Sequence, residues 1–389
     1  MMNGLRIDVD LEKISDNARS LVDRAAQRGI SITGVTKALL GEPRLARVLV
    51  AAGVVALGDS RIENIERMRH AHVNTRMMLM RSPMMSQVNR VVRSNTISVN
   101  SNIDVLTELA TAARVCGRVH PVMIMAELGD LRVGAMANDL HAIVRHILRC
   151  PSLRLEGIGT NFACRSGIEP IDEIMGELSG LVEKIESAFG IHIDTVSGGN
   201  SANIGWLAST ENVGRINNLR LGESILLGRG PLCRQPIEGL HTNAITLVGE
   251  VIESHRKPTR PRGRANHNVF GEVVNATDDR GEIWQTTIAA GTQDTDPDDI
   301  RPPVGITVLA ASTDHLILAT PARMKPGSSI RFELGYSALL RSMTSPFVAK
   351  ELTGVNGPLP AVAVTSRRQS DVARLRPERR PTLTIMPRI

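Results

Sequence analysis

Eight short apolar runs alternate with helix-like stretches through the first 230 residues, and this alternation limits the possible folds more than any other feature. Buried parallel strands read as short apolar runs, whereas residues 104–116 and 171–189, which lie between such runs, repeat apolar residues at helical spacing. Eight such βα units predict a TIM (β/α)8 barrel, with a doubly wound parallel sheet as the alternative. The predicted strands are residues 33–38, 54–57, 77–80, 96–99, 121–126, 155–159, 193–196 and 224–227.

Polar residues accompany all of these predicted strands, and a barrel would bring them to one face. TIM-barrel enzymes keep their active sites at the carboxyl ends of the strands. Ordinary loop polarity is the simpler explanation, but its repetition along the chain favours a shared site. The residues are Lys37, Asp59, Ser60, Arg61, Arg81, Asn100, Glu127, Asp130, Arg132, Thr160, Asn161, Ser197, Asn200, Ser201, Arg220, Gly228 and Gly230.

Lys37 is the most informative of these residues, because it ends the first predicted strand in the stretch TGVTKALLG. Gly41 and Pro43 end the strand before a helical pattern begins. An amine at a strand end that is partly shielded from water has a lowered pKa, which suits covalent chemistry with a carbonyl group. The alternative is a lysine that merely reaches solvent.

The loop SGGNSANI, residues 197–204, has the composition of an anion site. Two glycines, one of them Gly199, let the backbone approach a ligand closely, and Ser197 and Ser201 add hydroxyl groups. We expect the anion to be a phosphate. The alternative is an ordinary turn, which the same residue types also form.

The pattern changes at about residue 235 to alternating strands without helices between them. We therefore predict a barrel over residues 1–234, a β-rich domain over 235–350, and a basic, disordered tail over 351–389. The strands predicted in the β-rich domain are residues 243–252, 269–274, 283–289, 306–310, 315–319 and 329–334.

Most of the net charge of +6 comes from the tail, which contains seven arginines and three acidic residues. The rest of the chain carries a net charge of only +2. Aromatic residues make up 2% of the chain, so few groups are available to stack on bases, and we expect no nucleic-acid partner. The four cysteines form no CxxC pair, which argues against a metal site. No apolar run reaches the length of a membrane span and no secretory pattern is seen, so we expect a cytoplasmic protein without a membrane partner.

Eight motifs follow one another along the chain: TGVTKALLG, LGDSRIENI, MAELGDLRVG, GIGTNFACRSG, SGGNSANI, LRLGESILLG, AASTDHLIL and FELGYSALLRSMTSPFV. Taken together, they resemble those of the fold-type III pyridoxal-phosphate enzymes, and most of all the ornithine racemase branch of the alanine racemase family. The resemblance covers residues 5 to 350 and implies pyridoxal 5'-phosphate as cofactor and racemisation of an amino acid as a small-molecule substrate.

The resemblance also implies roles for single residues. Lys37 would carry the cofactor covalently, and Arg220 would contact the pyridine nitrogen. Asn161 stands where alanine racemases have a histidine beside the ring, and Arg132 matches an arginine that borders the cofactor and the substrate carboxylate. The residues implied at the cofactor phosphate are Ser201 and Gly228, with Ser197, Gly199 and Asn200 beside them.

Inversion of an amino acid needs a base on each face of its α-carbon, and Lys37 can serve only one. The loop AAGTQDTD lacks the tyrosine that alanine racemases contribute across their dimer. Tyr336, the only tyrosine in the chain, is a candidate for the second base unless it is an ordinary core tyrosine. Asp314 matches an aspartate that reaches the partner subunit's active site in alanine racemases, so the resemblance implies a homodimer with composite active sites. The other candidates are Cys164, Asp294, Asp314 and His315.

Two other functions would use the same lysine. A fold-type III decarboxylase would also need a cysteine near the substrate, such as Cys164 or Cys233. A non-catalytic pyridoxal-phosphate carrier would have the barrel alone, and the β-rich domain argues against it. We favour the racemase.

The predicted substrate is a basic amino acid such as ornithine or lysine. The resemblance is one reason, and carboxylates after barrel strands are the other, because a buried ammonium needs a charged partner. The alternative is that these acids pair with neighbouring arginines and only hold the barrel mouth together. The acids are Asp59, Glu63, Glu127 and Asp130, and His315 is a further candidate near the substrate.

Overall fold

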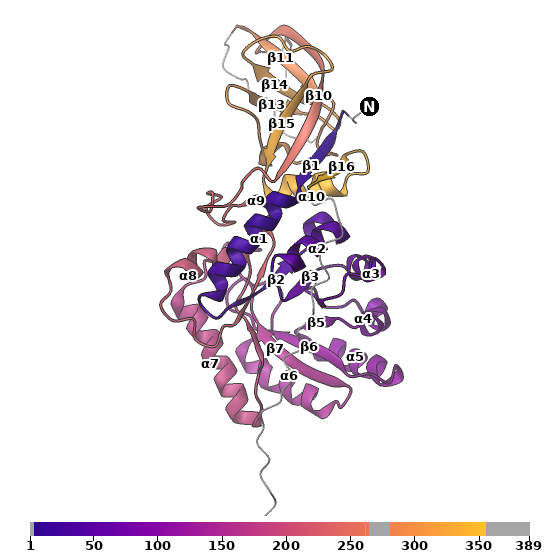
Figure 1. Ribbon diagram of the computed structural model, residues 1–389, viewed down its shortest axis with the longest axis vertical. Coiled ribbons are helices and arrows are strands. Elements are labelled where there is room, and N and C mark those ends of the chain that lie inside the picture. The colour runs from indigo at the N-terminus through magenta and orange to yellow at the C-terminus, as the bar shows by residue number, and fades with distance from the viewer. Residues whose placement is uncertain (1–3, 261, 264–280, 355–389) are drawn as a thin grey trace, which may run out of the picture. The chain divides into compact units, whose positions relative to one another are not determined.

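The computed structural model describes residues 4–260, 262–263 and 281–354, and eight parallel strands form a closed barrel in it (Figure 1). Each strand pairs with the next along the chain, and β9 closes on β2 with Gly34 opposite Leu221. This confirms the TIM barrel and excludes the doubly wound sheet, which is open. The barrel strands are β2 (Ser31–Val35), β3 (Ala56–Asp59), β4 (Arg76–Leu79), β5 (Ile97–Asn100), β6 (His120–Met125), β7 (Leu153–Gly159), β8 (Thr195–Ser197) and β9 (Asn218–Leu221).

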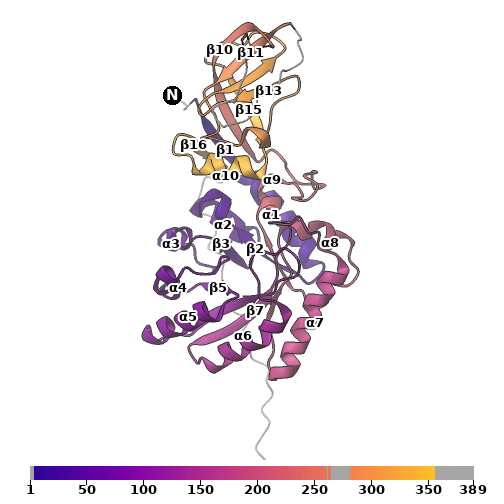
Figure 2. The ribbon, with the colours of Figure 1, turned by 180° about the vertical axis from the view of Figure 1, so that it is seen from behind.

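Helices α2 to α7 lie around the outside of the barrel (Figures 1 and 2). Helix α5 shows why they form there: it buries Leu106, Leu109 and Ala113 at helical spacing, and the Asn102 side chain caps its first turn. The helices are α1 (Leu11–Ala26), α2 (Pro43–Ala51), α3 (Ile62–His70), α4 (Val88–Arg93), α5 (Ile103–Val115), α6 (Ala137–Arg149), α7 (Asp172–Phe189), α8 (Ile204–Ser209), α9 (Glu223–Leu227) and α10 (Tyr336–Thr344), with short 3-10 helices η1 (Lys37–Leu39), η2 (Met85–Gln87), η3 (Ser201–Asn203) and η4 (Pro297–Asp299).

The prediction of the last barrel strand was wrong. Residues 224–227 belong to helix α9, and the strand lies just before them, at Asn218–Leu221. A short buried apolar run has the same pattern in a strand and in a helix, so periodicity could not separate them. The true strand was missed because two buried polar residues, Asn218 and Arg220, interrupt its apolar pattern.

A second sheet confirms the β-rich domain, with the strand order β12-β15-β10-β11-β14-β13. Neighbouring strands in this order run antiparallel, as in β10 and β15, where Leu247 faces Phe332. The alternation of buried and exposed residues in β15 is typical of such a sheet. Its strands are β10 (Ile245–Pro258), β11 (Glu282–Ile288), β12 (Ile300–Arg301), β13 (Thr307–Ala311), β14 (Leu316–Thr320) and β15 (Ser329–Leu334).

Two strands near the ends of the described chain extend this sheet. Strand β1 (Arg6–Asp10) pairs antiparallel with β10 and parallel with β16 (Ala349–Thr353). The domain bounds at residues 234 and 350 stay predictions. The predicted strand 269–274 and nearly all of the predicted tail lie outside the described residues. No helix in the part of the chain that the structure describes has both the length and the apolar character that a membrane span requires.

Candidate active site

Lys37 lies where strand β2 gives way to η1, at the carboxyl end of the barrel. Leu40 and Gly41 then adopt left-handed backbone conformations, with φ of 54° and 64°, and turn the chain into α2. A Cβ on Gly41 would lie 2.8 Å from the carbonyl oxygen of Asn64, so the turn needs a glycine. Lys37 Nζ lies 5.7 Å from the centroid of the Tyr336 ring, at the start of α10, and this cation–π contact joins two distant parts of the chain.

The Ser201 hydroxyl gathers hydrogen-bond donors from the segment that follows β9. Its Oγ accepts from the backbone N–H groups of Gly222 at 3.3 Å and Ser224 at 3.2 Å, and from the Ser224 hydroxyl at 3.0 Å. Backbone N–H groups that converge in this way, beside two hydroxyl groups, are a donor set that suits a phosphate.

Two glycines are required by the close packing of this cradle. A Cβ on Gly222 would lie 2.9 Å from the Cβ of Val35, at the end of β2. Gly199 has φ of 142°, and a Cβ there would collide with the Asn203 side chain, which accepts a hydrogen bond from the Asn200 N–H at 2.9 Å. The donors and the glycines therefore fit the phosphate group of pyridoxal phosphate, close to the strand that leads to Lys37.

Arg220 is a buried cation at the same end of the barrel. Its Nη1 donates to Ser197 Oγ at 2.5 Å and its Nη2 to the Thr160 carbonyl at 2.5 Å. Burial lowers the pKa of Arg220 to about 10, so the guanidinium stays charged at neutral pH. No acidic side chain among the described residues pairs with it, and an anionic cofactor would supply the missing charge.

Asn161, Asn200 and Cys164 share one network across the loops after β7 and β8. The Asn200 side chain donates from Nδ2 to Asn161 Oδ1 at 3.1 Å and lies 3.5 Å from Cys164 Sγ. Asn161 Nδ2 in turn donates to Asp130 Oδ2 at 3.2 Å, which ties in the loop after β6. Neighbouring barrel strands thus bring together three of the predicted site residues.

The carboxylates after β6 hold their own loops. Glu127 Oε1 accepts from two backbone N–H groups at 2.7 and 2.9 Å. Asp130 accepts from the Arg165 N–H at 2.9 Å and from Arg132 Nε at 3.4 Å. Burial raises the pKa of Asp130, but the backbone hydrogen bonds outweigh it, and the pKa falls below its usual value.

Asp59 and Glu63, which come earlier in the chain, also accept hydrogen bonds from neighbouring residues. Asp59 is fully buried, and its oxygens accept from the Thr36 hydroxyl at 2.8 Å, from Asn64 Nδ2 at 2.9 Å and from a backbone N–H at 3.0 Å. Burial raises the pKa of Asp59 despite these hydrogen bonds. Glu63 lies on helix α3 and accepts from Arg90 at 2.9 Å. Each of the four predicted acids therefore already has a partner.

Three other predicted residues lie elsewhere in the described chain. Gly228 ends α9 with φ of 60°, and it packs against the His241 carbonyl rather than against Ser201. Asp314 and His315 form an exposed ion pair between β13 and β14, with His315 Nδ1 2.8 Å from Asp314 Oδ1. The hydrogen bond from His315 lowers the pKa of Asp314.

Sequence reasoning missed Glu223, the first residue of α9, although it lies in the quoted motif LRLGESILLG. Burial and then the charge of Asp299 raise the pKa of Glu223 to about 7, against the opposite pull of Arg234 and Lys37. Burial, followed by the charge of Glu223, raises the pKa of Tyr336. Glu223 is therefore an acid close to both Lys37 and Tyr336.

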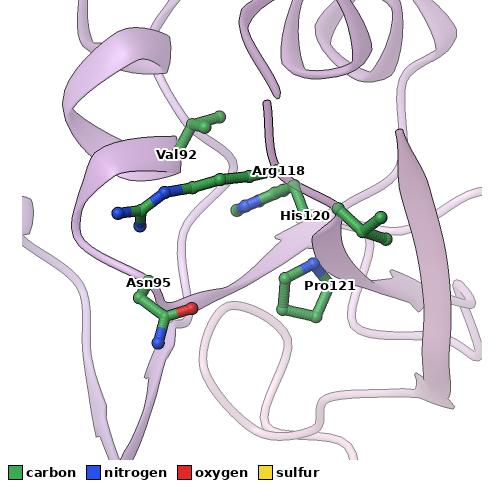
Figure 3. Close-up of a pocket in the computed structure, with 6 residues that line it drawn as sticks. Val92, Asn95, Arg118, His120 and Pro121 are labelled. Carbon is green, nitrogen blue, oxygen red and sulfur yellow. The ribbon is translucent and has the colours of Figure 1, made fainter. Parts of the chain in front are cut away.

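A pocket of about 340 Å³ opens at the amino-terminal ends of β5 and β6, which is the other end of the barrel from Lys37 (Figure 3). Arg118, Asn95 and His120 are its polar lining residues. Burial lowers the pKa of His120 to about 4, and its Nε2 lies 2.8 Å from Ser98 Oγ. Among the residues that the structure describes, no three His, Cys, Asp or Glu side chains are grouped as metal ligands would be.

Known proteins resemble this chain in sequence and in fold. The family described as alanine racemase, N-terminal domain, matches residues 9–229. A lysine racemase from Thermotoga maritima is 39% identical over 89% of this chain and 97% of its own, and an ornithine racemase from Acetoanaerobium sticklandii is 33% identical over 89% and 99%. An alanine racemase structure from Streptomyces lavendulae has a TM-score of 0.71 over 92% of this chain and 98% of its own, at 17% identity, which shows the shared fold.

These matches confirm the resemblance that the motifs carry. They span the barrel and the β-rich domain, and the relatives are racemases rather than decarboxylases or non-catalytic carriers. The donor set around Lys37, Ser201 and Arg220 fits the cofactor that the family uses. The chain therefore belongs to the alanine racemase family and is a pyridoxal-phosphate-dependent amino-acid racemase.

Proposed function

We propose that this racemase interconverts the L and D forms of a basic amino acid, lysine or ornithine. The observation that carries the proposal is the identity of 39% and 33% to a lysine racemase and an ornithine racemase over nearly their whole lengths. In sequence, two alanine racemases align with only 49% and 40% of this chain, at 25% and 27% identity.

In the proposed site, Lys37 would hold the cofactor covalently, and Ser201 and the Gly222 N–H would hold its phosphate. Arg220 and Asn161 would contact its pyridine ring. Bound pyridoxal phosphate acidifies the α-hydrogen of an amino acid attached to it. The Lys37 amine would move the proton on one face of the α-carbon.

Arg132 is proposed to bind the substrate carboxylate. Its Nε donates to Asp130 at 3.4 Å, and its side chain is still 47% exposed, so the guanidinium has further donors to offer. Asp130 in turn accepts from Asn161 at 3.2 Å. The substrate carboxylate would therefore lie close to the Asn161 amide, which we propose contacts the pyridine ring.

We propose Cys164 as the base on the other face. Tyr336 is poorly placed to accept a proton, because burial raises its pKa and the phenol therefore keeps its own. Cys164 is exposed, shares the Asn200 and Asn161 network, and lies within electrostatic range of Arg220. A cysteine side chain can give up and take back a proton, which is what the second face of the α-carbon requires.

The remaining parts of the proposal concern the assembly and its location. We propose a homodimer in which Asp314 and His315 of one subunit complete the site of the other, since both are exposed and lie on the β-rich domain. A cytoplasmic location is supported by the four cysteines, all of which are free.

A chiral assay of the purified holoenzyme tests the substrate. Each of a panel of L and D amino acids is incubated with the enzyme, and the enantiomers are separated by chiral chromatography. Lysine or ornithine should be converted from both directions with the highest kcat/KM. Faster conversion of alanine would contradict the proposal.

A further inference from the structure

A basic substrate needs a carboxylate for its distal ammonium, and the four acids that the sequence offered are engaged elsewhere. Asp59 and Asp130 each accept several hydrogen bonds from their own or neighbouring loops, and Glu127 holds two backbone N–H groups. Glu63 pairs with Arg90 on the outside of the barrel. The ammonium partner is therefore to be sought among other acids near Lys37.

Glu223 lies where such an acid is needed. Leu221 ends β9 opposite Gly34 of the adjacent parallel strand β2, so the segments that follow these strands emerge side by side. Gly222 is packed against Val35, because a Cβ on Gly222 would lie 2.9 Å from the Val35 Cβ. Glu223 thus begins α9 at the rim from which Lys37 also projects.

The carboxylate of Glu223 is free to take a ligand. It accepts no hydrogen bond from any residue that the structure describes. Asp299, an acid within electrostatic range of Glu223, is already held by Arg234 at 2.8 Å and by the N–H of Ser337 at 2.8 Å. Glu223 also lies within electrostatic range of Lys37, on η1, and of Tyr336, on α10.

We propose that Glu223 binds the distal ammonium of the substrate and so sets the specificity for basic amino acids. This inference rests on the proposed function. An ammonium that enters this partly buried position unpaired would lose its hydration without compensation, whereas the Glu223 carboxylate supplies a charged hydrogen bond. An apolar side chain of the same length would leave that carboxylate buried and unpaired, and the site would reject it.

The test compares lysine with norleucine, a near-isostere that lacks the ammonium. In Glu223→Gln holoenzyme, the ratio of kcat/KM for lysine to that for norleucine should fall about 10- to 100-fold, which corresponds to one charged hydrogen bond. Glu63→Gln is the matched control, since it neutralises an exposed acid on α3, and it should leave the ratio unchanged.

The pH dependence gives a second readout. Because the pKa of Glu223 is about 7, the wild-type ratio for lysine over norleucine should rise as the pH increases through 7 and the carboxylate ionises. The other charged or titratable groups within electrostatic range of Glu223 are all retained in Glu223→Gln, and they are Lys37, Tyr336, Asp299 and Arg234. If the ratio for lysine over norleucine no longer rises with pH in Glu223→Gln, the ionisation of Glu223 is the source of the rise in the wild type.

Glu223→Asp keeps the charge but withdraws it by one methylene group. The ratio of kcat/KM for lysine to that for ornithine should therefore increase, because the longer side chain still reaches the carboxylate. Equal losses for lysine, ornithine and norleucine in both Glu223 variants would overturn the inference. Failure of the wild type to racemise lysine or ornithine would instead overturn the proposed function.

Discussion

Arg220 shows how one residue constrains the chemistry of the site. It is a buried guanidinium whose Nη1 and Nη2 are held by Ser197 and the Thr160 carbonyl, and its pKa of about 10 keeps it charged. A guanidinium can donate a hydrogen bond to a pyridine nitrogen without giving up its proton. The protons that move in racemisation must therefore be carried by other residues, of which Lys37 is the first that we propose.

Cys164 offers a test at the scale of single residues. Cys164→Ala should reduce racemisation about 100-fold or more, because one face of the α-carbon loses its base. Exchange of the α-hydrogen in D2O, followed by NMR, should continue for the one enantiomer whose α-hydrogen faces Lys37. Cys233→Ala removes the other exposed cysteine and serves as the control. Unchanged racemisation in Cys164→Ala would exclude the thiol as the second base.

Among the structural elements, the segment from β9 to α9 positions several residues of the proposed cofactor site. The strand supplies Arg220, the residue after it is Gly222, and the first helical residue is Glu223. Gly222 has no room for a Cβ against Val35, whereas nothing lies within 4 Å of the position that a Cβ on Gly205 would take. The two glycines therefore form a matched pair for mutation.

Gly222→Ala should weaken the binding of pyridoxal phosphate about tenfold or more, because an added methyl group in a packed segment costs about 1–3 kcal/mol. The Gly205→Ala control adds the same group in helix α8, in open space, and should bind the cofactor as the wild type does. Titration of the apoenzyme, followed by the cofactor absorbance, measures both. Equal affinities for the two variants would show that this segment does not hold the cofactor.

Sequence reasoning succeeded at the end of β2 and failed in the segment from β9 to α9. The position of Lys37 at the end of a strand could be predicted, because an apolar run followed by Gly41 and Pro43 is a local signal in the sequence. The last barrel strand could not be predicted correctly, since a short buried apolar run has the same pattern in a strand and in a helix. Placing that strand six residues too late put the phosphate glycine at Gly228 and hid Glu223. The hydrogen bond from Thr36 to Asp59 also could not be predicted from the sequence, because only the folded barrel brings the two residues together.

At the scale of the whole molecule, the proposed dimer makes each active site depend on two chains. Lys37→Ala and Asp314→Asn should each be inactive as homodimers. When the two variants are unfolded, mixed and refolded, random pairing should restore up to about a quarter of the wild-type activity, since half of the dimers would hold one intact site. Refolding each variant alone is the control. A mixture that stays inactive would argue against shared sites.

Lys37 is the residue on which the whole account depends, and borohydride reduction of the cofactor-loaded enzyme tests it most directly. Reduction fixes the cofactor to the lysine that carries it, and peptide mapping by mass spectrometry then identifies that lysine. The label should lie on Lys37 and should be absent from Lys37→Ala. A label on another lysine, such as Lys184 or Lys257, would contradict the placement of the active site at the carboxyl end of the barrel.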